Sequence, residues 1–332
     1  VDNYRYMENL KDPQVAAWIK SQSDYAHGVL ESIPGRASLL KRLQQLDQTV
    51  PRVQPTRLPG NVYLILKRLP TEDVAKLYLR RGAAGSDKLL VNPENVKLEN
   101  QAKGKNTIQY FAPSLDNKYV AVGIAPGGSE RDTEMRFFDM ATGRELGDVV
   151  ARAWGANPNW LPDNRSVVYT KLQKVGPDTP VTEIEQKVRG YLHVLGTDGE
   201  NDPAVFGYGV DPSINVDPTH FAYVSVLPNT NYAIGFINTG VDPNSAVYIE
   251  PLGNLVKKES AWKRIADFDD DVSDAEVHGD DLYILRSRTR FATNCCARAR
   301  QSPIWRVRRR SLRRPRPWSA RSVSPKMRCT FN

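Results

Sequence analysis

Residues 157–206 decide the fold. The stretch reads NPNWLPDNRSVVYTK (157–171), then a polar connection, then RGYLHVLGTDGENDPAVF (189–206). A Trp-Leu-Pro-Asp-Asn turn precedes a β-branched run at Ser166–Lys171, and a second strand at Gly190–Leu195 ends in the Gly-Thr-Asp-Gly turn of Gly196–Gly199. Alternation of short strands with Gly, Pro, Asn and Asp turns is typical of antiparallel sheets such as β-propeller blades.

The same pattern recurs along the chain. Phe111–Val122 aligns with Asn159–Tyr169, and Ile214–Val224 is a weaker copy. Two copies are followed by similar turns, at Asp139–Gly143 and Leu195–Gly199. Repeats about 50 residues apart favour a propeller over a sandwich or a barrel. We therefore predict a mainly β chain, an incomplete β-propeller of the seven-bladed type with about four to five blades, behind N-terminal helices.

Three segments are predicted: helices in 1–55, the partial propeller in 56–285, and a basic tail in 286–332. Asp12 and Pro13 begin the first helix, Pro34-Gly35 ends it, and leucines give the second helix an apolar side that we expect to be buried. Pro51, Pro55 and Pro59 predict a stiff connector that is not helical. The predicted strands are Val62–Lys67, Lys76–Arg80, Tyr119–Ile124, Met135–Asp139, Val167–Lys171, Tyr191–Leu195, Phe221–Leu227, Ala233–Asn238, Ala246–Ile249 and Asp281–Leu285.

The charge of the chain divides at position 285. The tail holds 15 of the 46 basic residues and none of the 38 acidic ones, so residues 1–285 carry a net charge of −7 although the whole chain has +8. The three cysteines, Cys295, Cys296 and Cys329, also lie in the tail, so the body has no disulfide framework. No apolar run approaches the ~18 residues of a transmembrane helix, and we expect a soluble protein of the cytoplasm or periplasm.

Several motifs together resemble the prolyl oligopeptidase family of serine peptidases. Asp2–Asn9 is similar to the family's D-P-Y-R-W-L-E-D segment, but Asn3 replaces the usual Pro and Tyr6 the usual Trp. Asp12–Ile19 follows its D-P-E-V-x-x-W pattern, and Tyr191–Asp198 matches its Y-x-H-x-L-G-T-D blade segment. The resemblance covers residues 1–285.

This resemblance implies a function for the propeller. In the family, N-terminal helices pack against an α/β-hydrolase domain that carries the Ser, Asp and His of the triad, and a seven-bladed propeller restricts entry to short peptides. The printed sequence contains no Gly-x-Ser-x-Gly nucleophile elbow. We therefore expect the propeller region of a prolyl oligopeptidase-like endopeptidase, truncated before its catalytic domain and inactive alone. The alternative is a non-catalytic propeller that binds a peptide or a protein.

The tail allows three interpretations. It could be a basic arm that binds a membrane or nucleic acid, in which case Trp305 and Trp318 could stack on bases. It could also be a disordered segment, or the product of a frameshift. With GC-rich codons, Asn294–Ala297 read from the third base encodes Leu-Leu-Arg, and Ser302–Arg306 in the same frame encodes Ala-Asp-Leu-Ala. Both runs are similar to the family at this point, which favours the frameshift over a nucleic-acid partner.

Few side chains are candidates for chemistry. Trp154 could face the propeller tunnel or a substrate cavity, and no catalytic residue, metal site or cofactor is predicted. Ser129 in Gly127–Arg131 lacks the second glycine of a nucleophile elbow and belongs to a predicted hairpin loop. His193 is expected to be structural, and Asp267–Asp271 to form a solvated turn between blades. Peptide substrates are expected only if a catalytic domain is supplied.

Overall fold

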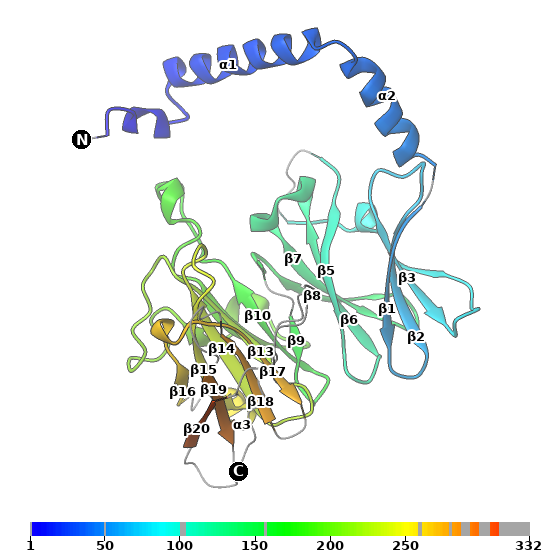
Figure 1. Ribbon diagram of the computed structural model, residues 1–332. Coiled ribbons are helices and arrows are strands. Elements are labelled where there is room, and N and C mark those ends of the chain that lie inside the picture. Colours follow the sequence, from blue (N-terminus) through cyan, green and yellow to red (C-terminus); the bar gives the residue numbers. More distant parts are fainter. Residues whose placement is uncertain are drawn as a thin grey trace. The chain divides into compact units, whose positions relative to one another are not determined.

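The computed structural model describes residues 2–49, 51–99, 104–155, 158–257, 261–278, 281–286, 293–298 and 306–311. Strands dominate the described chain, and α1 (Pro13–Ser32) and α2 (Arg36–Asp47) precede them (Figure 1). One further α-helix, α3 (Leu252–Lys257), follows β15. Short 3₁₀ helices occur at η1 (Arg5–Glu8), η2 (Pro93–Asn95), η3 (Pro126–Gly128), η4 (Glu130–Asp132), η5 (Val181–Glu183), η6 (Gly199–Asn201) and η7 (Phe268–Asp270).

The strands form five four-stranded sheets whose members follow one another in sequence. Sheet 1 contains β1 (Arg52–Leu58), β2 (Val62–Arg68), β3 (Lys76–Arg81) and β4 (Lys88–Val91). Sheet 2 contains β5 (Thr107–Pro113), β6 (Tyr119–Ala125), β7 (Glu134–Asp139) and β8 (Glu145–Val150). Sheet 3 contains β9 (Asn159–Trp160), β10 (Ser166–Lys171), β11 (Arg189–Val194) and β12 (Ala204–Gly207). Sheet 4 contains β13 (Phe221–Val226), β14 (Tyr232–Asn238), β15 (Ser245–Pro251) and β16 (Lys263–Ala266). Sheet 5 contains β17 (Val272–His278), β18 (Asp281–Arg286), β19 (Thr293–Arg298) and β20 (Arg306–Ser311).

The sheets are built alike. Neighbouring strands in sheets 2 to 5 pair antiparallel. In each of sheets 1 to 4 the register shifts between the third and fourth strands, as at Leu77/Tyr78 and Gly190/Tyr191. Such irregularities increase local twist. Five sequential, antiparallel, twisted sheets confirm the prediction of a mainly β, incomplete propeller with about four to five blades.

Apolar clusters join consecutive sheets. Four clusters link sheet 1 to 2, 2 to 3, 3 to 4, and 4 to 5. Pairs of members from facing sheets are Leu77 and Ile124, Phe137 and Tyr169, Phe206 and Tyr248, and Ile249 and Leu282. Among the described residues, none of these clusters combines side chains of sheets 1 and 5. Each sheet is therefore stabilised by its neighbours in sequence.

The hairpin turns repeat a conformation that favours asparagine. Asn61, Asn117, Asn164 and Asn229 all have φ between 54° and 59°, in the first hairpin of sheets 1 to 4. Asn adopts the left-handed region more readily than other residues with a Cβ. The repeat alignment of 111–122 with 159–169 is thus confirmed. The alignment of a third copy at 214–224 was wrong, because these residues lead into the first strand of sheet 4, β13. The turn equivalent to those of the other two copies lies between β13 and β14, at Leu227–Asn231.

The helical segment differs from its prediction in burial. Asp12 caps α1 through its Oδ1 atom, which accepts a hydrogen bond from the Gln14 amide (2.8 Å), and Pro13 is the first helical residue, as expected. The leucine side of α2 is not buried, however, and Leu39 and Leu43 are 60% and 53% exposed. No residue of α2 is buried.

The proline-rich connector is not helical, as predicted, but it forms a strand instead of a plain connection. Residues 52–58 form β1, the first strand in the order of sheet 1. Pro55 lacks an amide hydrogen, which an edge strand tolerates because one side of its backbone is unpaired. The ten strands that were predicted were all confirmed to within two residues at each end. No helix among the described residues is both long enough and apolar enough to span a bilayer.

Candidate functional site

A pocket of about 490 Å³ lies where the first hairpins of sheets 2, 3 and 4 end, and we call it the hairpin pocket. It is lined by Ala112, Pro113, Leu115, Pro158, Asn159, Trp160, Pro162 and residues 226–231. The lining contains no ionisable side chain. Prolines, aliphatic carbons and carboxamides give the pocket a neutral surface, which suits an uncharged segment of peptide better than a charged ligand.

Trp160 holds two sides of the hairpin pocket together. Its indole Nε1 donates a hydrogen bond to the Ala112 carbonyl (2.9 Å), so sheet 3 is joined to sheet 2. The ring lies edge-on to Phe137 (centroids 6.0 Å apart) and stacks on Tyr119. Only 4% of Trp160 is exposed. The indole therefore forms part of the framework of the pocket, and little of its surface is available for a ligand.

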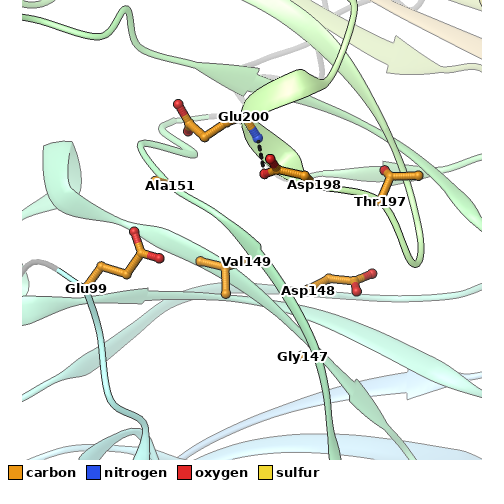
Figure 2. Close-up of a pocket in the computed structure, with 8 residues that line it drawn as sticks. All are labelled: Glu99, Gly147, Asp148, Val149, Ala151, Thr197, Asp198 and Glu200. Carbon is orange, nitrogen blue, oxygen red and sulfur yellow. Dashed lines mark hydrogen bonds between the residues drawn. The ribbon is translucent and has the colours of Figure 1, made fainter.

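A second pocket, of about 260 Å³, is acidic and lies between β8 and the turn around η6 (Figure 2). We call it the edge pocket. It is lined by Glu99, Gly147, Asp148, Val149, Ala151, Thr197, Asp198 and Glu200. Asp198 accepts a hydrogen bond from the Glu200 amide (2.9 Å), the contact drawn in Figure 2, so this carboxylate caps η6.

Basic side chains neutralise one of these carboxylates. Glu200 accepts two hydrogen bonds from Arg152 (2.9 and 3.0 Å) and lies 3.1 Å from Lys171. Burial lowers the pKa of Lys171, and the ion pair with Glu200 opposes that shift. Burial alone would raise the pKa of Glu200, but hydrogen bonds from Arg152 and Lys171 lower it. Glu200 is thus committed to contacts within the protein.

A buried polar network lies next to the edge pocket. His193 of β11 is fully buried, and its Nδ1 is 3.0 Å from both carboxylate oxygens of Asp202. The Tyr169 hydroxyl donates to Asp202 Oδ2 (2.8 Å). Burial, and then the Asp202 carboxylate, raise the pKa of Tyr169. The expectation that His193 is structural agrees with its complete burial.

Trp154 lies just before residues 156–157, which are outside the described chain. The side chain is half-buried, and its ring contacts Phe221 at the start of β13, with centroids 5.3 Å apart. The Trp154 amide donates to the Thr170 carbonyl (3.0 Å). Trp154 lines neither the hairpin pocket nor the edge pocket. A role facing substrate remains a prediction.

The other candidate residues occupy loops or helices. Ser129 lies between η3 and η4, in the connection from β6 to β7, and its hydroxyl donates to Asp132 (2.7 Å). Asp267–Asp271 connects β16 to β17 around η7, with a capping box formed by Asp267 and Asp270. His27 is exposed on α1. The described residues include no group of three or more His, Cys, Asp or Glu side chains placed to hold a metal ion.

The comparison with protein families shows the family to which the chain belongs. Residues 1–295 match the family model described as "Prolyl oligopeptidase, N-terminal beta-propeller domain". This chain belongs to the prolyl oligopeptidase family. It is 24% identical to a prolyl endopeptidase of Elizabethkingia meningoseptica over 289 residues, which are 86% of this chain and 38% of the relative. A prolyl endopeptidase of Elizabethkingia miricola is 20% identical over 322 residues, 97% of this chain and 41% of the relative.

Solved structures of the family agree with the sheets described above. A structure from a study of two prolyl endopeptidases and their inter-domain dynamics superposes with a TM-score of 0.69 at 25% identity, over 86% of this chain and 39% of that one. Prolyl oligopeptidase B of Galerina marginata superposes with a TM-score of 0.67 at 15% identity, over 85% of this chain and 40% of that one, and supports the fold alone. The chain spans about two fifths of the length of these relatives.

Sequence reasoning found the family but missed both pockets. The Tyr191–Asp198 and Asp202-Pro203 segments carried the resemblance, and they contain His193 and Asp202. Asp148 had no signal, because β8 is a short strand without a continuous apolar run. The hairpin pocket could have been anticipated from the repeated Leu-Pro-Asp-Asn type of turn, had Leu227–Asn231 been aligned with Leu161–Arg165.

The predicted boundary at Arg286 coincides with the end of β18. β19 and β20 lie beyond this boundary and belong to sheet 5. Trp305, Trp318 and Cys329, together with the remainder of 287–332, lie outside the described residues.

Proposed function

We propose that this chain supplies the helices and the propeller part of a prolyl oligopeptidase-like serine endopeptidase. The propeller would limit hydrolysis to short proline-containing peptides, and the triad would be provided by a separate α/β-hydrolase domain. Membership of the family supports the class of reaction. We also retain the proposal that Trp154 faces the substrate cavity.

The exposed apolar surface of α1 and α2 carries this proposal. Its large members are 40–72% exposed: Trp18, Ile19, Tyr25, Val29, Leu30, Leu39, Leu40, Leu43 and Leu46. In α1 and α2 only Val15 is buried. Soluble proteins seldom expose so many large apolar side chains together unless the surface binds something. A catalytic domain packed on these helices would bury this surface, and burial stabilises the contact by about 25 cal/mol per Å² of apolar area.

The 332-residue polypeptide itself is expected to be inactive. Its sequence has no Gly-x-Ser-x-Gly segment, and the Ser129 hydroxyl donates its hydrogen bond to the Asp132 carboxylate. Purified polypeptide should not cleave a prolyl chromogenic peptide. Cleavage that a serine-directed inhibitor abolishes would contradict this expectation.

The proposal is tested by adding a catalytic domain. The polypeptide is mixed with the separately produced hydrolase part of the Elizabethkingia meningoseptica prolyl endopeptidase, and kcat/KM is measured for a chromogenic dipeptide and for a peptide of about 30 residues. We expect a one-to-one complex in which the ratio of kcat/KM, short to long substrate, rises at least about tenfold. Failure to associate, or an unchanged ratio in a formed complex, would overturn the proposal.

A matched pair of helix variants tests the surface. Leu43→Asp places a charge on the apolar side of α2, whereas Gln45→Asp adds the same charge on its polar side. We expect Leu43→Asp to weaken association about tenfold or more, and Gln45→Asp to leave it within about twofold. Circular dichroism should show equal folding of both, because neither side chain is buried.

The hairpin pocket favours a second candidate, a non-catalytic module that binds peptides. Its neutral lining of proline, aliphatic and carboxamide groups resembles surfaces that recognise extended segments. This alternative predicts binding of proline-containing peptides by the polypeptide alone, lost in Leu115→Asp. Binding that requires the added hydrolase part supports the first proposal instead.

A further inference from the structure

The side chain of His193 connects two sheets. Its Nδ1 contacts Asp202 at 3.0 Å, and Asp202 lies in the connection from η6 to β12 of sheet 3. Its Nε2 lies 3.5 Å from Oδ2 of Asp148, which belongs to β8 of sheet 2. That Nε2 atom is buried and has no hydrogen-bond partner. The imidazole is therefore placed between two carboxylates from different sheets.

This arrangement cannot be satisfied by a neutral imidazole. A neutral ring has one N–H donor and one bare acceptor nitrogen, and an ionised carboxylate only accepts. Whichever nitrogen carries the proton, the other contacts a carboxylate without a proton to donate. A doubly protonated ring has donors on both nitrogens, and each would face an acceptor. The geometry thus suits the imidazolium.

The surrounding groups reinforce the two carboxylates. Tyr169 from β10 donates to Asp202, and the Gly196 amide donates to Asp148 Oδ2 (2.7 Å). Phe137 from β7 stacks on the imidazole (centroids 5.1 Å apart, planes at 20°) and carries no charge. The nearby Lys171, on β10, is paired with Glu200 of η6. The two carboxylates that face His193 are therefore held in place. Within the described part of the chain, no cation that would compete for them contacts the ring.

We propose that Asp148, His193 and Asp202 form a proton-operated latch between sheets 2 and 3. When His193 is doubly protonated, the ring bridges both carboxylates and strengthens the interface between the sheets. When the ring loses a proton, the contact with Asp148 becomes a repulsion between two acceptors, and the interface weakens. The latch belongs to the propeller alone and does not depend on a catalytic partner.

Urea unfolding of the full chain at pH 5.5 and pH 8.5 tests the latch. Asp148 is 12% exposed at its side chain, so Asp148→Asn should fold. At pH 5.5 this variant should lower the folding equilibrium constant about tenfold, as expected for a hydrogen bond between charged groups. At pH 8.5 the loss should be less than about threefold, because the wild-type contact is then already weakened. The wild type should accordingly lose more stability than the variant between the two pH values.

Asp198→Asn is the matched control. It removes a carboxylate from the same edge pocket, but Asp198 caps η6 through the Glu200 amide and is not one of the two carboxylates that contact His193. Its effect on the folding equilibrium should be equal at both pH values. An equal loss for Asp148→Asn at the two pH values would overturn the latch.

Proton NMR gives a second readout that does not require unfolding. The chain has four histidines, so the ring resonance of His193 can be assigned by eliminating the others with His27→Gln, His220→Gln and His278→Gln. We expect Asp148→Asn to move this resonance more at pH 5.5 than at pH 8.5 while the fold is retained. An equal displacement at the two pH values would refute the proposed role of the second carboxylate.

Discussion

Replacing Trp160 tests whether consecutive sheets depend on the contacts between them. Trp160→Phe keeps an aromatic ring but removes the donor to the Ala112 carbonyl, a bond of 2.9 Å that joins sheets 3 and 2. A buried acceptor left without a partner costs about 1–3 kcal/mol. The smaller ring also loses part of its contact with Phe137 and Tyr119, and aromatic pairs contribute about 0.5–1.5 kcal/mol each. We therefore expect a loss of about 2–3 kcal/mol.

Such a loss is a large part of the ~5–15 kcal/mol that stabilises an ordinary domain. With a urea dependence of about 3 kcal/mol per M, the unfolding midpoint should fall by roughly 0.7–1 M. Circular dichroism in the far ultraviolet is the proper signal, because the substitution alters tryptophan fluorescence directly.

Trp154→Phe provides the matched control. Trp154 is half-buried and contacts the ring of Phe221, so its replacement should cost less than about 1 kcal/mol. Equal midpoints for Trp160→Phe and wild type would refute the reasoning. So would a loss in Trp154→Phe as large as that in Trp160→Phe.

Two further predictions concern packing and pH. Gly235→Ala should destabilise the chain by about 1–3 kcal/mol in thermal unfolding, because the new Cβ would lie 2.7–2.9 Å from three ring atoms of Phe206. The control is Gly253→Ala in α3, where the new Cβ meets nothing within 4 Å, so the melting temperature should be unchanged or higher. Equal melting temperatures for the two variants would contradict the packing argument. Hydrogen bonds from the Thr142 amide and hydroxyl lower the pKa of Asp139, so its contribution to stability is present at neutral pH and is lost as the pH falls through the folded-state pKa. Asp139→Ala should therefore lower the urea midpoint at pH 7 and approach the wild type in acid, and a constant difference across this range would exclude the linkage.

Sequence reasoning succeeded where residues act locally or through a strong pattern. Asp12 and Pro13 begin α1 because capping depends on two adjacent positions. Strands that are buried along nearly their whole length read as mostly apolar runs, as at β6 (Tyr119–Ala125) and β14 (Tyr232–Asn238). Short first and fourth strands were mostly missed, since strands such as β4 and β16 have only four residues and a polar or exposed side.

Burial on the helices and the polar network could not be predicted for another reason. The spacing of Leu39 and Leu43 shows that α2 has an apolar side, but not what covers that side. Likewise, the role proposed for His193 depends on its contact with Asp148, which is 45 positions away and lies in a different sheet. Contacts of this kind depend on how sheets face one another, and a single sequence does not encode them in a readable pattern.

The four apolar clusters, each shared by two consecutive sheets, make stability a sum over neighbours. Among the described residues, sheets 2, 3 and 4 each contribute to two clusters, and sheets 1 and 5 each contribute to one. A chain organised in this way behaves as a one-dimensional array, in which order spreads from unit to unit and is lost first at the ends. A terminal blade can therefore be added or removed in evolution without redesigning the interfaces of the middle blades.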